Sequence, residues 1–100
     1  MSKLHVTEII AEAFMIKPER IFEQSRLRDV IDARHFAMWV YRTKLHHSPS
    51  VIARRFNKNH ATVIHAVNKV EHLRDKDFEY KKKRALKSLE DAGIFDETKN

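Results

Sequence analysis

The stretch "SPSVIARRFNKNHATVIHAV", residues 48–67, contains the local signals that decide the fold. Ser48 can cap a helix, and Pro49 fits the first helical position, where its missing N–H is not needed. Asn59 can cap a second helix, whose apolar residues begin at Val63 and recur at helical spacing. The intervening "NKN" predicts a tight turn, because asparagine tolerates left-handed backbone. Two helices, ending near residues 56 and 74, therefore form a helix-turn-helix.

Apolar residues also recur at helical spacing before this stretch. Residues 6, 9, 10, 13 and 14 carry them at i, i+3, i+4, i+7 and i+8, which predicts a first helix that ends near Ile16, ahead of Pro18. Pro18 can start a short helix through residue 23, with Ile21 and Phe22 expected to face inward. Residues 24–31, "QSRLRDVI", lack this spacing and predict a loop.

Two more helices complete the predicted fold. Residues 32–45 have an apolar stripe wide enough for a central helix, and residues 77–91 form a last helix that Gly93 ends. One glycine and two prolines in 100 residues argue against a turn-rich β protein. We predict an all-α fold of about five to six helices, one domain over residues 1–95, and a disordered tail over residues 96–100.

The charge balance favours a polyanionic partner. Lys and Arg number 20 against 14 Asp and Glu, a formal net charge of +6. Such a chain suits nucleic acid or an anionic membrane surface, and charge alone does not choose between them. No apolar run reaches transmembrane length, and the N-terminal residues do not resemble a secretory signal. We expect a cytoplasmic protein that does not bind membranes.

The sequence offers little for metal binding or catalysis. It has no cysteine, which excludes disulfides and thiolate ligands. His60 and His65 do not share a helical face, and His65 and His72 are two turns apart. No nucleophile stands beside an orienting carboxylate, and no GxxxxGK[ST] loop is present to cradle a nucleotide. We therefore predict no metal, cofactor, nucleotide or enzymatic activity.

Spacing alone leaves a second interpretation open, since a helical hairpin of this kind also occurs in all-α proteins that do not bind DNA. The run "YKKKR", residues 80–84, could bind phosphate, although a solvated helix face is the more common role of such a run.

Four segments carry a family resemblance. They are "SRLRDV" (25–30), "ARHFAM" (33–38), "HHSPSVIARRF" (46–56) and "NHATVIHAVNKVEHL" (59–73). Together they resemble the C-terminal DNA-binding domain of DnaA, the bacterial chromosomal replication initiator, over about residues 8–73. The resemblance implies a Trp-repressor-like helix-turn-helix domain that binds a short asymmetric DNA box of the TTATCCACA kind.

The resemblance also implies roles for individual residues. Arg28 matches the loop arginine that enters the minor groove, and Arg26 is the runner-up for that role. Arg34 and Arg42 match positions that contact the DNA backbone. The positions matching the helix start and the major-groove readers are Pro49, Ser50, Asn59, His60, Ala61 and Thr62. We expect phosphate contacts by Arg34, Arg42, Arg54 and Lys58 to set the register on DNA and to supply most of the affinity.

The chain departs from the family pattern at the reading helix. Asn59 stands where the family has aspartate, Ala61 replaces threonine, and the turn is one residue shorter and lacks the family's glycines. An asparagine can both donate and accept, the pattern that pairs with adenine, so we expect a changed base preference opposite Asn59.

We therefore predict a stand-alone, monomeric protein that binds double-stranded DNA sequence-specifically, in replication or transcription regulation. A lone domain of this type suggests a bacterial chromosome, a phage or another mobile element as its source. The alternative is a protein-interaction adaptor or decoy that keeps the fold without specific DNA binding.

Overall fold

The structure, a computed structural model, describes residues 4–95, and these residues contain helices and no strand. The elements in chain order are α1 (Leu4–Ala13), the 3-10 helix η1 (Pro18–Phe22), α2 (Arg28–Thr43), α3 (Pro49–Phe56), α4 (His60–His72) and α5 (Lys76–Asp91). The all-α prediction is confirmed. The predicted disordered tail, residues 96–100, lies outside the described residues.

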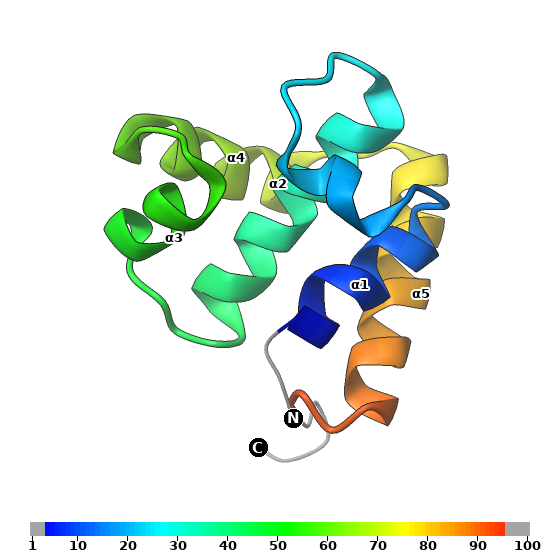
Figure 1. The fold of residues 1–100 in the computed structure, drawn as a ribbon. Coiled ribbons are helices and arrows are strands. Elements are labelled where there is room, and N and C mark those ends of the chain that lie inside the picture. The colour runs from blue at the N-terminus through cyan, green and yellow to red at the C-terminus, as the bar shows by residue number, and fades with distance from the viewer. Residues whose placement is uncertain (1–3, 96–100) are drawn as a thin grey trace.

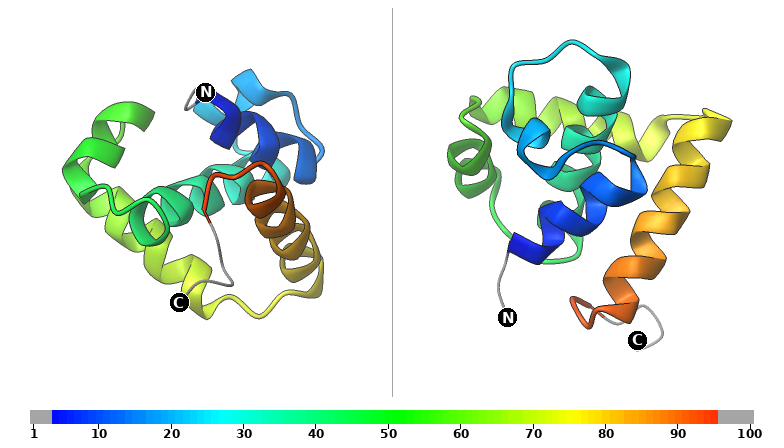
Figure 2. Two further views of the ribbon diagram at one scale, coloured as in Figure 1. Left: turned by 90° about the horizontal axis from the view of Figure 1, so that it is seen from below. Right: turned by 45° about the vertical axis from the view of Figure 1, so that its right-hand side comes forward.

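Helix α2 is the central element, as its wide apolar stripe predicts. Figure 1 shows α3 and α4 on one side of α2, and α1 and α5 on the other. The view from below in Figure 2 shows the same division. Phe36 of α2 is fully buried, and its ring lies 5.7 Å from that of Phe14. Tyr41, further along α2, contacts Phe56 of α3, with 6.2 Å between the ring centroids.

The start of α2 differs from the prediction. The helix begins at Arg28 rather than at residue 32, so the loop before it spans residues 23–27. Val30, Ala33 and Ala37 are all buried and lie at helical spacing, which draws the first turn onto the core. Charged residues between them obscure this pattern in the sequence.

Two smaller predictions about the N-terminal part are wrong. Helix α1 ends at Ala13, because Met15 adopts left-handed backbone (φ 63) and the Ile16 N–H donates to the Ala11 carbonyl at 3.0 Å. Phe22 is 45% exposed instead of facing inward. Its ring stacks on that of Phe56 with 5.2 Å between centroids.

Helix α5 contributes more to the core than its composition suggests. Asp75 caps it by accepting from the Phe78 N–H at 2.9 Å, and Phe78 is buried against α1 and α2. Lys81 is only 6% exposed and forms ion pairs with Asp29 at 3.1 Å and with Asp77 at 3.2 Å. The interpretation of residues 80–84 as a solvated face is therefore wrong for Lys81, which joins α5 to the start of α2.

Candidate nucleic-acid interface

Both predicted caps of the helix-turn-helix are present. The Ser48 hydroxyl accepts from the Val51 N–H at 3.2 Å. The Asn59 Oδ1 atom accepts from the Thr62 N–H at 2.9 Å. Between the helices Asn57 is left-handed (φ 56), and the next N–H, of Lys58, donates to the Ala53 carbonyl at 2.9 Å. Asn57 therefore occupies the left-handed position after α3, where glycine is the usual residue.

The first turn of α4 presents polar and small side chains to solvent. Asn59, His60 and Ala61 are exposed and Thr62 is half-buried, whereas Val63 is fully buried beneath them. Burial of Val63 anchors α4 to the domain. The opening turn is consequently available to a partner, as a recognition helix requires.

The exposed face of α4 extends further than the sequence interpretation anticipated. Ile64, His65 and Asn68 are exposed and follow Ala61 at i+3, i+4 and i+7, so the four share one face. Ile64, although apolar, is 48% exposed. These additional residues could have been identified in the sequence from their helical spacing after Ala61.

The geometry of Asn59 limits what its amide can do. Oδ1 accepts from both the Thr62 N–H and, at 3.0 Å, the Thr62 hydroxyl. A carbonyl oxygen has two lone pairs, so both are occupied. Only the Nδ2 amino group remains for a base, and the expected two-bond pairing of Asn59 with adenine does not fit this conformation.

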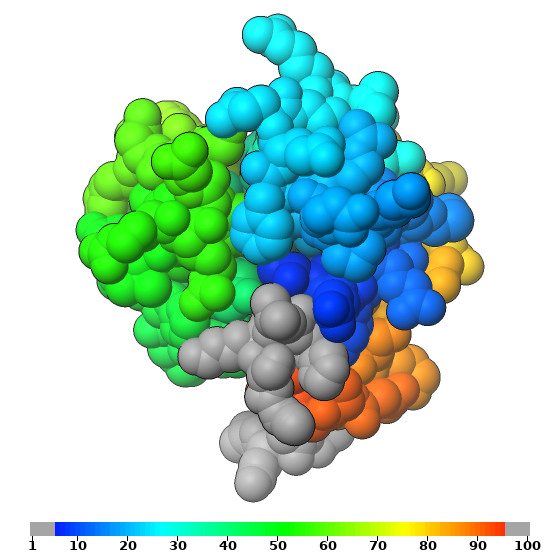
Figure 3. All heavy atoms as spheres, in the orientation of Figure 1, coloured from blue at the N-terminus to red at the C-terminus, as the bar shows by residue number. Residues whose placement is uncertain are grey.

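The loop at residues 23–27 lies beside the helix-turn-helix. Figure 1 shows it next to α3 and α4, and in Figure 3 the cyan segment that contains it projects beside their green surface. The Lys58 ammonium donates to Gln24 Oε1 at 3.2 Å, which joins the turn to the loop. Arg26 is exposed and forms no ion pair within residues 4–95. Its guanidinium is therefore available to an anionic partner.

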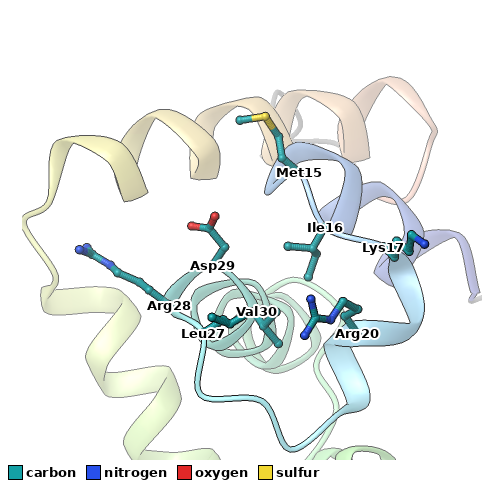
Figure 4. Close-up of a pocket in the computed structure, with 8 residues that line it drawn as sticks. All are labelled: Met15, Ile16, Lys17, Arg20, Leu27, Arg28, Asp29 and Val30. Atoms are coloured by element: carbon teal, nitrogen blue, oxygen red, sulfur yellow. The ribbon is translucent and has the colours of Figure 1, made fainter.

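Arg28 occupies a different environment from Arg26. It is the first residue of α2, and Figure 4 shows its side chain extending toward the connection between α4 and α5. Its guanidinium pairs with Asp75 at 3.0 Å and with Asp32 at 3.4 Å. The hydrogen bond to Asp75 is the main cause that raises the pKa of Arg28 above its usual value. Two carboxylates therefore hold the side chain predicted to enter the minor groove.

Arg28 also lines a hollow of about 540 Å³ between the end of α1, η1 and the start of α2. The side chains in Figure 4 form its apolar and basic lining, namely Met15, Ile16, Leu27, Val30, Lys17 and Arg20, together with the acidic Asp29.

Arg34 is buried rather than displayed. It is 7% exposed, and its Nη1 atom donates to the Glu23 carbonyl at 2.6 Å. Burial lowers the pKa of Arg34 below its usual value. The arginine that was predicted to contact the DNA backbone therefore lies beneath the loop. It holds Glu23, the first residue of that loop.

The remaining predicted residues lie on the surface of the helix-turn-helix. Arg54, Ser50 and Arg42 are exposed, while Pro49 is half-buried. Arg42 donates to the His47 carbonyl at 3.4 Å. Arg42 and Pro49 also line a groove of about 310 Å³ that continues along the exposed face of α4 past Ile64 and Asn68.

Within residues 4–95 no group of three or more histidine, aspartate or glutamate side chains is arranged to hold a metal ion. In the same part of the chain, no helix has the length and apolarity needed to cross a membrane.

Comparison with known proteins identifies the family. The family described as "Bacterial dnaA protein helix-turn-helix" matches residues 4–70, which end within α4. The chain is 35% identical over 79 residues to the chromosomal replication initiator protein DnaA of Aquifex aeolicus, covering 78% of this chain and 20% of that protein. It is 39% identical over 72 residues to the DnaA protein of Wolbachia sp. subsp. Brugia malayi, covering 71% and 16%. With the DnaA protein of Deinococcus deserti, the identity is 32% over 93 residues, covering 88% and 20%.

The chain thus spans about a fifth or less of the length of these relatives. The matched part of the family is a DNA-binding helix-turn-helix. The matched residues include the loop before α2, helix α3, the turn after it and α4 as far as residue 70. The chain belongs to the family of bacterial DnaA helix-turn-helix domains.

Proposed function

We propose that this domain binds double-stranded DNA sequence-specifically, with α4 in the major groove and the loop at residues 23–27 in the adjacent minor groove. The observation that carries the proposal is the exposed first turn of α4 beside a loop whose Arg26 is exposed and has no ion pair within residues 4–95. In a helix-turn-helix, the first turn of the second helix is the part that reaches base edges. A narrow A·T-rich minor groove attracts an inserted arginine.

Arg26 is the better candidate for the minor groove. Arg28 would have to leave Asp75 and Asp32, whereas Arg26 is exposed and has no acidic partner within the described residues. The ion pairs of Arg28 therefore favour Arg26, which reverses the order suggested by the family resemblance.

The contacts to phosphates would come from the basic side chains around the turn. Arg54 and Arg42 are exposed, and Lys58 is half-buried against Gln24. Such contacts fix the register of the protein on the duplex, and base contacts by α4 supply the specificity. The two reading elements belong to one domain, so we propose that a monomer suffices.

The relatives are chromosomal replication initiator proteins, which supports a biological role of the same kind. We propose that this domain recognises boxes of the same kind, in the cytoplasm, and acts without catalysing a reaction. The occupied Oδ1 of Asn59 gives some support to the alternative, a protein-interaction adaptor. Salt-sensitive binding to a defined duplex distinguishes the two.

Replacing Arg26 by alanine should weaken binding to a TTATCCACA duplex about tenfold, and binding to a scrambled duplex much less, because a groove arginine contributes to discrimination. Arg28→Ala should leave the ratio between the two duplexes nearly unchanged. Fluorescence anisotropy titrations with both duplexes measure this ratio.

Lys83→Ala is the matched control, since Lys83 is exposed on α5, on the other side of α2 from α4. Equal losses of discrimination in Arg26→Ala and Lys83→Ala would refute the role assigned to the loop. A larger loss in Arg28→Ala than in Arg26→Ala would restore Arg28 to the minor groove.

A further inference from the structure

The loop that carries Arg26 is held from beneath by α2. Glu23 caps the C-terminal end of η1, where carbonyl groups lack a helical donor. The Arg34 guanidinium supplies that donor at 2.6 Å from the Glu23 carbonyl. A hydrogen bond from an ionised donor is among the stronger kinds, and it is shielded here because Arg34 is 7% exposed. The first residue of the loop is therefore fixed to the central helix.

The same segment is also held from the side by the helix-turn-helix. Phe22, immediately before the loop, stacks on Phe56, the last residue of α3. Gln24, the second residue of the loop, accepts from Lys58 in the turn between α3 and α4 at 3.2 Å. Within the loop, the Leu27 N–H donates to the Ser25 hydroxyl at 3.1 Å. The contacts thus join the loop to the turn that precedes the recognition helix.

These contacts have a consequence for recognition. Two reading elements that are fixed relative to one another before binding need no ordering when DNA arrives, so less affinity is lost to conformational entropy. They also fix the distance between the major-groove and minor-groove contacts. A box then has to present its A·T-rich flank at one set spacing from the bases read by α4.

We propose that Arg34 and Gln24 are positioning residues that hold the Arg26 loop in register with α4, so that the domain reads both grooves as one rigid unit. The proposal rests on the function proposed above. Arg34 acts through the loop backbone and Gln24 acts through Lys58. Neither side chain needs to touch DNA, which separates this role from the phosphate contact that the family resemblance implies for Arg34.

The test compares three duplexes. The first carries the site that the wild type prefers, the second has the A·T-rich flank of that site replaced by G·C pairs, and the third has the bases read by α4 changed. The wild type should prefer the first duplex over the second, the flank preference, about tenfold. In Gln24→Ala and Arg34→Met, this preference should fall to about twofold to threefold, while discrimination at the bases read by α4 stays unchanged. Arg34→Lys keeps a donor and a charge, and should recover part of the preference.

A second readout separates positioning from phosphate binding. If Arg34 contacted a phosphate, Arg34→Met would reduce the slope of log affinity against log salt by about 0.9. For a positioning residue the slope stays unchanged. If circular dichroism shows that Arg34→Met does not fold, the flank preference of Gln24→Ala still tests whether the loop must be held in register. Gln24 is exposed, so its replacement leaves no cavity.

Full flank preference in Gln24→Ala, or in a folded Arg34→Met, would overturn the positioning role alone. A wild type that prefers no duplex would overturn the proposed function, and the positioning role with it. A reduced salt slope in Arg34→Met would return Arg34 to the DNA backbone and also overturn its positioning role.

Discussion

A fourfold rise in salt, from about 50 to about 200 mM, should weaken binding to a specific duplex roughly 40-fold. Three basic side chains of the helix-turn-helix and its surroundings are placed to meet phosphates, namely Arg42, Arg54 and Lys58. Each neutralised phosphate releases about 0.9 counterion, so three contacts predict a slope of about −2.7 in log affinity against log salt. Arg26 is proposed to enter the minor groove and Arg34 is buried, so neither adds a phosphate contact.

The slope is measured by anisotropy titrations at several salt concentrations. Arg54→Ala should reduce its magnitude by about 0.9, and Lys83→Ala, on α5, should leave it unchanged. A slope near zero would mean that the basic side chains do not meet a polyanion. The protein-interaction alternative would then be the better account of this surface.

Acidification should destabilise the domain over a pH range that is set by the pKa of His35. Burial, with further contributions from Lys69, Arg34 and Lys58, lowers the pKa of His35 from 6.5 to about 4. The unfolded chain therefore takes up a proton on this ring as the pH falls below about 6.5, while the folded domain does not. Stability is fully present above that pH and decreases toward pH 4.

The expected loss between about pH 7 and about pH 4.5 is roughly 2.5 kcal/mol of unfolding free energy, obtained from the difference between the two pKa values. Urea denaturation at the two pH values measures it. His35→Phe removes the titrating group and should abolish most of this difference. The Asp75 carboxyl does not interfere, since a backbone hydrogen bond from Phe78 lowers its pKa and moves its contribution to more acidic pH. An equal pH dependence in the variant would exclude His35 as the cause.

The helix-turn-helix could be predicted because its signals are local. Ser48 and Asn59 cap helices through residues three positions away, and Asn57 makes its turn through hydrogen bonds to α3. Each of these contacts can be anticipated from a few neighbouring residues. The fold class and the exposed first turn of α4 follow from the same short stretch.

The start of α2 could not be predicted in the same way. Its charged first turn is stabilised by residues far along the chain, with Asp75 paired to Arg28 and Lys81 paired to Asp29. No local pattern indicates partners separated by about half the chain. The same limit applies to Arg34, whose carbonyl partner Glu23 becomes a neighbour only when η1 folds back onto α2.

Selection from a library of random duplexes is the strictest test of sequence-specific DNA binding by this domain, because it assumes neither a box nor a partner. The wild-type protein should enrich one short asymmetric sequence related to TTATCCACA, with an A·T-rich flank on the side that the Arg26 loop reaches. Arg26→Ala should enrich the same bases opposite α4 without that flank. Recovery of no common sequence by the wild type, at low salt and with a folded protein, would contradict sequence-specific DNA binding by this domain.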